Sequence, residues 1–259
     1  MKRKITSIMH DPLLDTIRIN LPSSIDFTEY PYSLPIIRNL HEIKFTSKVT
    51  FFVGENGTGK STLVEAIAHK IGFGAEGGSK NISFKTSADT VYSGAQKLAD
   101  HTTLSWRQKP KDGYFFRAES FYTVANYLDS IERESGGAYG SYGGKSLHQQ
   151  SHGESFLSFF QNRIKDGFFI LDEPEGALSP QRQLSLLIII QQLCKKFNTQ
   201  FIIATHSPLL LAYPAATIYS FDNNSLEKIN YTQTSHYQIT KQFLNNPEFY
   251  LKNLFADNM

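Results

Sequence analysis

A short run of glycines ahead of a lysine and two hydroxyl residues has the spacing of a phosphate-binding loop. From Gly54 to Ser61 the chain fits the pattern G-x-x-x-x-G-K-[ST]. In such a loop, successive backbone N–H groups surround phosphate oxygens, and the helix that follows adds a partial positive charge. The pattern predicts that Lys60 reaches the β- and γ-phosphates and that the Ser61 hydroxyl binds Mg²⁺. The alternative is a glycine turn beside an ordinary surface lysine. The expected nucleotide contacts in this run are Gly54, Asn56, Gly57, Thr58, Gly59, Lys60, Ser61 and Thr62.

Two carboxylates, Asp172 and Glu173, follow the apolar run Phe168–Leu171. A buried strand would deliver both at its carboxyl end, where parallel α/β sheets place their ligands. Asp172 would then hold Mg²⁺ through its water shell. Glu173 would act as the general base that polarises an attacking water. A strand that ends in Asp-Glu is weak evidence alone, and it becomes strong when a phosphate loop accompanies it.

A histidine ends a second apolar run, and a small-residue segment precedes a helical one. His206 follows Ile202–Ala204 and is expected to contact the γ-phosphate and to respond to its presence, although a histidine in this place can also be structural. Ser151, Gly153 and Glu154 lie ahead of a helix-like run, where a Ser and a Gly can bind an anion. The sequence shows no direct route from this segment to the same nucleotide.

Strand-like and helix-like runs alternate around these residues, which predicts an α/β fold. The apolar run Val49–Val53 predicts the strand before the phosphate loop, and a helix over 61–71 follows the loop. The other expected elements are short strands over 1–53, edge strands over 80–93, a strand at 113–116, helices over 121–134, 145–165 and 180–197, buried strands over 167–171 and 200–204, a short helix at 209–212, a hairpin over 218–231 and one or two helices over 235–255 interrupted at Pro247.

The composition is that of a packed globular protein. The 259 residues are 40% hydrophobic and carry a net charge of +2, so the overall charge gives no sign of a polyanion partner. The single cysteine, Cys194, excludes an intrachain disulfide and fits a reducing cytoplasm. The basic start Met1–Lys4 is not followed by the apolar region of a signal peptide, and the longest aliphatic run, Leu186–Ile190, is too short to cross a bilayer. We expect a cytoplasmic protein without direct membrane insertion.

Taken together, the motifs resemble those of the ATP-binding cassette (ABC) ATPases. The phosphate loop matches at Gly54–Ser61, the second acidic motif at Phe168–Glu173 and the switch histidine at His206. The family's signature, usually Leu-Ser-Gly-Gly-Gln or -Glu, matches Gln150–Glu154, with Ser151, Gly153 and Glu154 fitting. The chain departs from the family at Gln150, at His152 and at Ser179, which replaces the acid of the loop after the acidic motif.

The non-transporter branch of the family, which includes the SMC-like and RecF-like ATPases, is the closer likeness. Its members carry an Arg-Asn pair near the nucleotide, so the resemblance implies contacts from Arg38 and Asn39. The family's glutamine loop has no glutamine here, and either Arg117 or Glu119 stands in its place. The interval before the signature holds no coiled coil, so the chain looks like a compact bacterial head of this type.

The resemblance implies an α/β P-loop NTPase fold, namely an ABC ATPase head with a mixed central sheet, an N-terminal antiparallel β region and a helical lobe. It implies one domain over 1–259, with 1–94 and 166–259 as the nucleotide-binding core and about 95–165 as the lobe that carries the signature.

The implied activity is hydrolysis of ATP with Mg²⁺ in a head-to-tail homodimer, in which Ser151 contacts the γ-phosphate of the other subunit. Such a nucleotide-driven switch would serve DNA repair or anti-phage defence, together with a nuclease or another effector and with DNA. The alternatives are the ATP-binding subunit of an ABC transporter and a nucleotide-sensing scaffold with negligible turnover.

Overall fold

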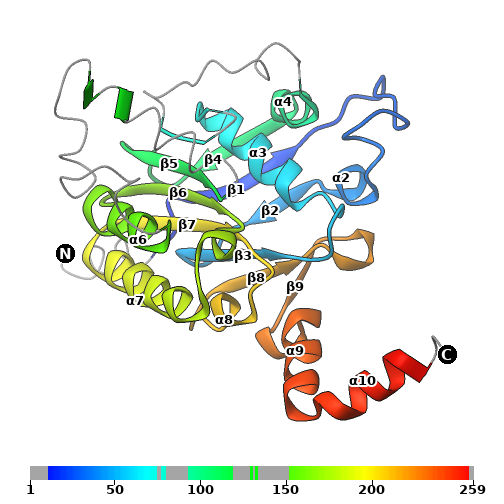
Figure 1. The fold of residues 1–259 in the computed structure, drawn as a ribbon. Helices are drawn as coiled ribbons and strands as arrows, with labels where there is room; N and C mark the ends of the chain where they lie inside the picture. The colour runs from blue at the N-terminus through cyan, green and yellow to red at the C-terminus, as the bar shows by residue number, and fades with distance from the viewer. Residues whose placement is uncertain are drawn as a thin grey trace, which may run out of the picture.

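The computed structural model describes residues 11–74, 77–79, 93–118, 129–130, 132–133 and 152–256. In this part of the chain a six-stranded sheet has the order β5-β6-β7-β3-β8-β9 (Figure 1). The first five strands in this order are parallel, and β9 is antiparallel to β8, so the expected mixed sheet is confirmed. The strands are β3 (Val49–Val53), β5 (Gly113–Arg117), β6 (Gly167–Asp172), β7 (Thr199–Ala204), β8 (Thr217–Ser220) and β9 (Glu227–Ile229).

The three central strands are apolar along their whole length because both faces of the sheet are covered. Every residue of β3, β6 and β7 is buried. On one face, Phe51 packs with α6 (His152–Arg163), α7 (Pro180–Lys196) and α8 (Pro208–Leu211). On the other face, Phe52 packs with α3 (Lys60–Ile71). Continuous β-branched and aromatic runs are typical of such doubly covered parallel strands.

A second, antiparallel sheet lies on the α3 side of the central sheet (Figure 1). Its strands, in the order β2-β1-β4, are β2 (Glu42–Lys44), β1 (Leu14–Ile19) and β4 (Thr102–Trp106). The N-terminal antiparallel β region is therefore confirmed. In the segment that follows α3, β4 joins this sheet, and β5, which the sequence predicted as a strand at 113–116, joins the central one. A strand is stabilised where its backbone N–H and C=O groups form hydrogen bonds with a neighbouring strand and its apolar side chains are buried.

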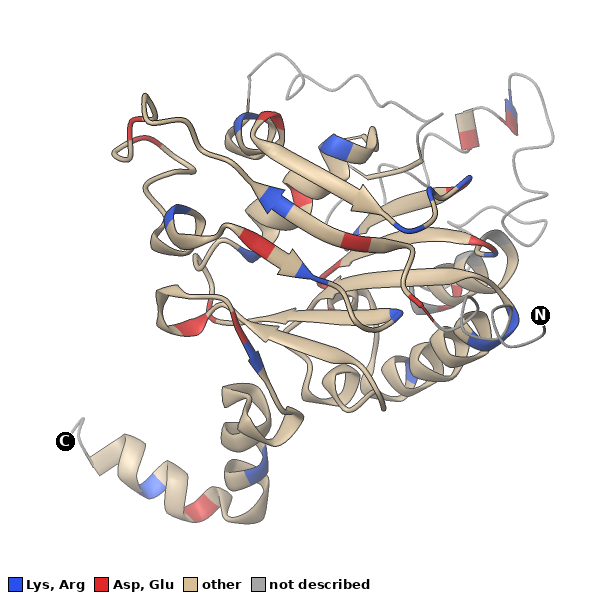
Figure 2. Cartoon of the chain, turned by 180° about the vertical axis from the view of Figure 1, so that it is seen from behind, with Lys and Arg blue, Asp and Glu red and all other residues tan. Residues whose placement is uncertain are grey.

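Charged residues on the small sheet are paired with the opposite sign. Glu42 on β2 lies 3.0 Å from Arg18 and 3.3 Å from Lys44, and Asp15 on β1 lies 2.6 Å from Arg107. Basic and acidic residues accordingly lie side by side in this region (Figure 2). The described part of the sheet is thus not a surface of one sign, and it offers no ready attraction for a polyanion.

Two short helices lie where the sequence predicted none. The segment α2 (Pro35–Asn39) begins at a proline, whose fixed φ suits the first helical position, within a region expected to hold only strands. The segment α4 (Gly94–Asp100) is capped by Ser93, whose hydroxyl accepts a hydrogen bond from the Gln96 N–H at 3.2 Å. The expected edge strands over 80–93 and the expected helix over 121–134 fall almost wholly outside the described residues.

The C-terminal part begins with the predicted hairpin of β8 and β9. A 3₁₀ turn, η5 (Asp222–Asn224), connects the two strands, and a second one, η6 (Tyr231–Gln233), follows β9. The helices α9 (Ser235–Asn245) and α10 (Pro247–Ala256) follow, and the break between them falls at Pro247 as predicted. They form an arm that extends away from the two sheets (Figure 1). No helix in the described ranges is long and apolar enough to cross a membrane.

Replacing Phe51 by Ala will strongly destabilise the fold. Phe51 is fully buried in the middle of the central sheet, and the change removes a large side chain from the cluster beneath α6 and α7. We expect a loss of about 3–5 kcal/mol in the free energy of unfolding, measured with urea. Ile188→Ala on α7, where the side chain is 58% exposed, should change it by less than about 0.5 kcal/mol. Similar effects of the two changes would show that Phe51 is not in the core.

Candidate functional site

The carboxyl ends of three neighbouring strands bring the predicted chemical groups to one edge of the sheet. In the parallel register, Phe52 of β3 and Asp172 of β6 both pair with Ala204 of β7. The segments that follow these strands are the phosphate loop, Glu173 with η4 (Pro174–Ala177), and the turn that contains His206. This is the edge at which open α/β sheets bind their ligands.

The phosphate loop needs glycine at defined points. Gly59, which precedes α3, has a φ of +99°, and a Cβ there would lie 3.2 Å from side-chain atoms of both Ile36 and Leu34. Gly54 has a φ of +146°, and its Cβ would lie 3.0 Å from Phe221 Cβ. A larger residue at either position would be strained and crowded. The glycines therefore let the loop turn tightly into the amino end of α3.

The Lys60 side chain lies across this loop. Its Nζ donates hydrogen bonds to the backbone carbonyls of Gly54, at 2.7 Å, and of Glu55, at 2.8 Å. Burial lowers the pKa of Lys60, and the nearby Glu173 and Asp172 carboxylates oppose that change. The ammonium group is thus held at the loop, where a phosphate oxygen can exchange for a carbonyl oxygen as its partner.

A cavity of about 150 Å³ lies along the loop and reaches Glu173. Two residues that the sequence analysis did not identify, Tyr30 and Leu34, also line this cavity. The Tyr30 hydroxyl is 2.6 Å from Thr62 Oγ1, so this ring is anchored to the first turn of α3. No local pattern marks Tyr30, because it reaches the loop only through the path of the chain between β1 and α2. The lining loop residues are Asn56, Gly57, Gly59, Lys60, Ser61 and Thr62.

The two predicted metal ligands face one another. Ser61 Oγ donates a hydrogen bond to Asp172 Oδ1 at 3.4 Å, and Asp172 is 5% exposed. Burial raises the pKa of Asp172 to about 6, although the Arg117 guanidinium opposes this. A buried carboxylate with a hydroxyl opposite supplies the hard oxygen ligands that Mg²⁺ prefers, and a cation there would favour the ionised form. The residues present therefore fit Mg²⁺.

Arg117 occupies the place beside this pair. At the carboxyl end of β5 its Nη1 lies 2.9 Å from Glu65 Oε1, and its Nε lies 3.7 Å from Asp172 Oδ2. The sequence left open whether Arg117 or Glu119 replaces the glutamine of the glutamine loop. Glu119 lies outside the described residues, and Arg117 is the one seen next to the candidate metal ligands.

Glu173 has an unusual backbone conformation. Its φ and ψ are 50° and 52°, in the left-handed region that residues other than glycine rarely adopt, and its N–H donates to the Ala204 carbonyl at 2.9 Å. The side chain is 46% exposed, and its Oε1 lies 3.5 Å from His206 Nε2. Strained residues of this kind collect at functional sites. The conformation directs the carboxylate to the cavity edge rather than into the core.

His206 is held by two residues that the sequence analysis did not select. Its backbone N–H donates to Glu175 Oε1 at 2.6 Å, and the other oxygen of Glu175 accepts from Thr205 Oγ1 at 2.7 Å. Its ring Nδ1 lies 3.0 Å from Nε2 of His236 on α9. Burial, and then the Lys60 charge, lower the pKa of His206, which favours the neutral ring at pH 7. Glu175 could have been selected from the sequence because it is a third acidic residue directly after Asp172 and Glu173. No sequence pattern marks His236.

Two family models match the chain over the segments that form this site. One, described as "AAA domain", covers residues 32–102, and one described as "AAA domain, putative AbiEii toxin, Type IV TA system" covers residues 156–212. The first span contains the phosphate loop, and the second contains the acidic pair and His206. The α/β fold, with its mixed sheet and a phosphate-loop pattern between β3 and α3, has the architecture of P-loop ATPase heads. No curated protein matches the chain.

Solved structures similar to this chain include the SMC head domain from Thermotoga maritima, with 16% identity, a TM-score of 0.43 and coverage of 84% of this chain and 98% of that one. Another is cbiO1 from Clostridium perfringens, part of an ABC transporter complex, with 18% identity, a TM-score of 0.45 and coverage of 95% and 99%. A third is the ADP conformation of MJ1267, an ATP-binding cassette of an ABC transporter, with 16% identity, a TM-score of 0.49 and coverage of 91% and 96%.

Some of the predicted nucleotide contacts point elsewhere in the described structure. Arg38 donates to the Phe27 carbonyl at 2.8 Å, and Asn39 donates to the Asn224 carbonyl at 3.4 Å, so neither side chain lines the loop cavity. Their helix, α2, instead supplies apolar packing against Gly59. Glu154 on α6 pairs with Arg182 on α7 at 3.2 Å. Gly153 lies in the first turn of α6, and Ser151 lies outside the described residues.

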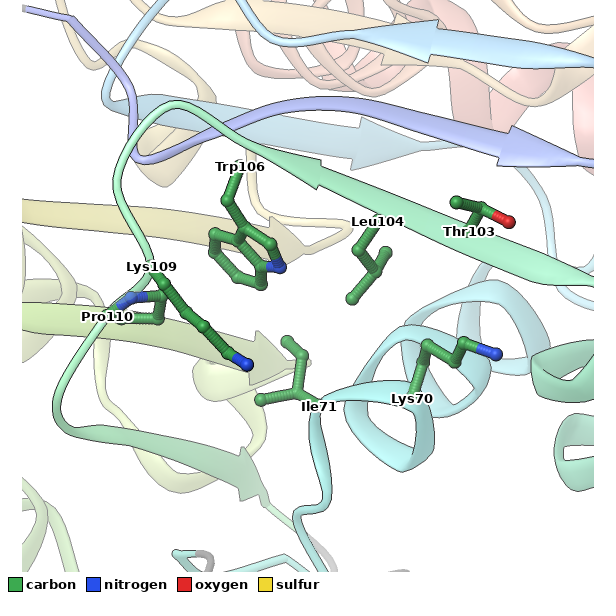
Figure 3. Close-up of a pocket in the computed structure, with 7 residues that line it drawn as sticks. All are labelled: Lys70, Ile71, Thr103, Leu104, Trp106, Lys109 and Pro110. Atoms are coloured by element: carbon green, nitrogen blue, oxygen red, sulfur yellow. The ribbon is translucent and has the colours of Figure 1, made fainter.

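A larger cavity, of about 460 Å³, lies at the other end of α3 (Figure 3). Lys70 and Ile71 of α3, Leu104 and Trp106 of β4, and Lys109 are among the residues around it. With a rise of about 1.5 Å per residue, α3 separates it from the phosphate loop by roughly 18 Å. It is therefore distinct from the loop cavity and cannot hold phosphates that Lys60 contacts.

Replacing Glu175 by Ala will slow any ATP turnover by this chain. The change removes the acceptor for both the His206 N–H and the Thr205 hydroxyl, so the turn that carries His206 loses its support. We expect an approximately 10- to 100-fold lower kcat, and about 1–3 kcal/mol less stability from two donors left without partners. Steady-state ATPase assays and urea unfolding measure these effects. Glu248→Ala on the exposed start of α10 is the control, and equal activity of the two variants would contradict this role for Glu175.

Proposed function

We propose that this chain binds ATP with Mg²⁺ at the phosphate loop and hydrolyses its γ-phosphate. The observation that carries the proposal is the meeting of Lys60, the Ser61–Asp172 pair and the Glu173–His206 pair at one edge of the sheet. Each pair joins residues that are far apart in sequence. A glycine turn beside a surface lysine would have no reason to gather these groups.

In the proposed complex, the loop N–H groups and Lys60 bind the β- and γ-phosphates, and the amino end of α3 adds its partial positive charge. Ser61 and Asp172 hold the metal, with Arg117 on the other carboxylate oxygen of Asp172. When bound, Mg²⁺ neutralises charge that develops on the phosphates during transfer. Tyr30 and Leu34, which line the same cavity, then contact the nucleotide.

Glu173 is placed to accept a proton from the attacking water, and His206 to donate a hydrogen bond to the γ-phosphate. His206 Nε2 is buried, and its contact with Glu173 Oε1, at 3.5 Å, is longer than a normal hydrogen bond. A phosphate oxygen would satisfy this group, because an unpaired buried polar atom is costly. The base and the donor would thus face the same phosphate.

We further propose that ATP joins two copies head to tail. Ser151, and the backbone N–H groups near Gly153 in the first turn of α6, would contact the γ-phosphate bound by the other copy. Hydrolysis would remove this bridge and loosen the dimer, by an amount set by the difference in ATP affinity between the closed and open forms. Light scattering with and without Mg-ATP tests this step, and a mass that stays that of a monomer would argue against it.

The cycle is proposed to drive a cytoplasmic process of DNA repair or anti-phage defence, with a nuclease or another effector as partner. The toxin–antitoxin description of the family model over 156–212 favours defence over transport. The position of Glu173 opposite His206 favours turnover over a passive nucleotide-sensing scaffold.

Two measurements separate these roles. ATPase activity that rises with added DNA, and whose stimulation falls with salt, would indicate phosphate contacts and a DNA-linked role. Affinity capture from the native host, with a slow-hydrolysing variant held in ATP, would identify the partner. A nuclease among the captured proteins supports the proposal, and a membrane permease supports the transporter alternative.

A further inference from the structure

The first helix of the C-terminal arm contacts the candidate active site through His236. His236, in the first turn of α9, places its Nε2 3.0 Å from His206 Nδ1, and the two ring centroids are 5.1 Å apart. The turn is fixed by Thr234, a fully buried residue whose hydroxyl accepts from the Tyr237 N–H at 3.3 Å. His236 is thus presented by a capped helix rather than by a loose chain end.

The contact between the two rings restricts where their protons lie. Two ring nitrogens 3.0 Å apart share one proton, so one nitrogen donates and the other accepts. If His206 donated from Nδ1, its Nε2 would be an acceptor and would face the Glu173 carboxylate oxygen at 3.5 Å. Two acceptors would then oppose each other. If His236 donates instead, His206 carries its proton on Nε2, and an N–H faces the carboxylate.

We propose that His236 is a positioning residue that holds His206 as the tautomer with its proton on Nε2, ready to donate to the terminal phosphate. The remaining nitrogen of His236, Nδ1, is then an acceptor, and Ser235 Oγ at 3.5 Å can supply a proton to it. Donors therefore run in one direction, from Ser235 through His236 and His206 toward Glu173.

The surroundings support two neutral rings. Burial, and then the His206 charge, lower the pKa of His236, and burial followed by Lys60 lowers that of His206. A neutral imidazole is what a fixed tautomer requires, because both nitrogens of a charged ring donate. The arm that carries His236 thereby becomes part of the site, although it follows the last strand of the sheet.

The tautomer is measurable without nucleotide. In ¹⁵N spectra of the histidine side chains, we expect His206 to show a protonated Nε2 and an unprotonated Nδ1. In His236→Ala the His206 signals should move toward a mixture of tautomers. A proton found on Nδ1 of His206 in the unaltered protein would overturn the proposal. The kinetic test below rests on the proposed ATPase function, whereas this measurement does not, so a failure of each is recognised separately.

The kinetic expectation for His236→Ala is a kcat lowered by about 10- to 100-fold, the usual effect of removing a hydrogen bond that orients a working histidine. The KM for ATP should change by less than about 3-fold, because the Lys60 contacts remain. His236→Gln, whose amide N–H can donate to the same nitrogen, should recover most of the loss. Ile239→Ala, exposed on the same helix, is the control. An unchanged kcat in folded His236→Ala, or a Gln variant no better than Ala, would count against the proposed role.

Discussion

Glu173→Gln will bind ATP nearly as well as the unaltered protein and will turn it over at least about 100-fold more slowly. The substitution keeps the size of the side chain and removes its ability to accept a proton from water, a contribution worth roughly 10²–10⁴-fold. The carboxylate does not lie among the groups predicted to bind the phosphates directly, so affinity should change by only a few fold. Fluorescent-nucleotide titration and a phosphate-release assay measure the two quantities.

The same variant tests the proposed dimer. If ATP joins two copies and hydrolysis separates them, blocking hydrolysis accumulates the joined form, which light scattering detects in Mg-ATP and not in Mg-ADP. Glu227→Gln on the exposed strand β9 is the matched control and should behave as the unaltered protein. Normal turnover in Glu173→Gln would remove this residue from the mechanism. Slow turnover with a persistent monomer would leave the general base in place and reject the dimer switch.

Lys60→Ala will strongly weaken ATP binding. Lys60 is 4% exposed and is the cation that the phosphate loop presents, so its loss removes a charge-assisted hydrogen bond to the β- and γ-phosphates. The expected loss is about 2–3 kcal/mol, or roughly 30- to 150-fold in affinity, measured by calorimetry or fluorescent-nucleotide titration.

Lys70→Ala is the control for this change, because Lys70 is exposed at the far end of the same helix. It removes the same charge from α3 and should leave ATP affinity within about 2-fold, as for a surface substitution away from the site. Circular dichroism and a thermal melt show whether each variant is folded. Tight ATP binding by a folded Lys60→Ala would place the nucleotide somewhere else on the molecule.

The parts of the site that the sequence predicted are local. The phosphate loop is one unbroken segment, and its glycines and lysine have fixed roles because the backbone itself forms the binding surface. The strands that carry Asp172 and His206 were recognisable because a strand covered on both faces must be apolar throughout. Break points such as Pro247 were recognisable because proline cannot continue a helix. The pairing of β4 and β5 was less predictable, since their partner strands in the two sheets are distant in sequence.

The sequence by itself therefore determined an α/β fold with a phosphate-loop pattern, with two acidic residues at the end of one strand and with a histidine after another. Only the tertiary structure decided which side chains surround them: Tyr30 at the loop, Arg117 beside Asp172, and Glu175 and His236 on the two sides of His206. It also turned Arg38 and Asn39 away from the cavity. The reason is physical: backbone patterns repeat over a few residues, whereas these contacts depend on the order of strands in the sheet and on where an arm at the end of the chain comes to rest.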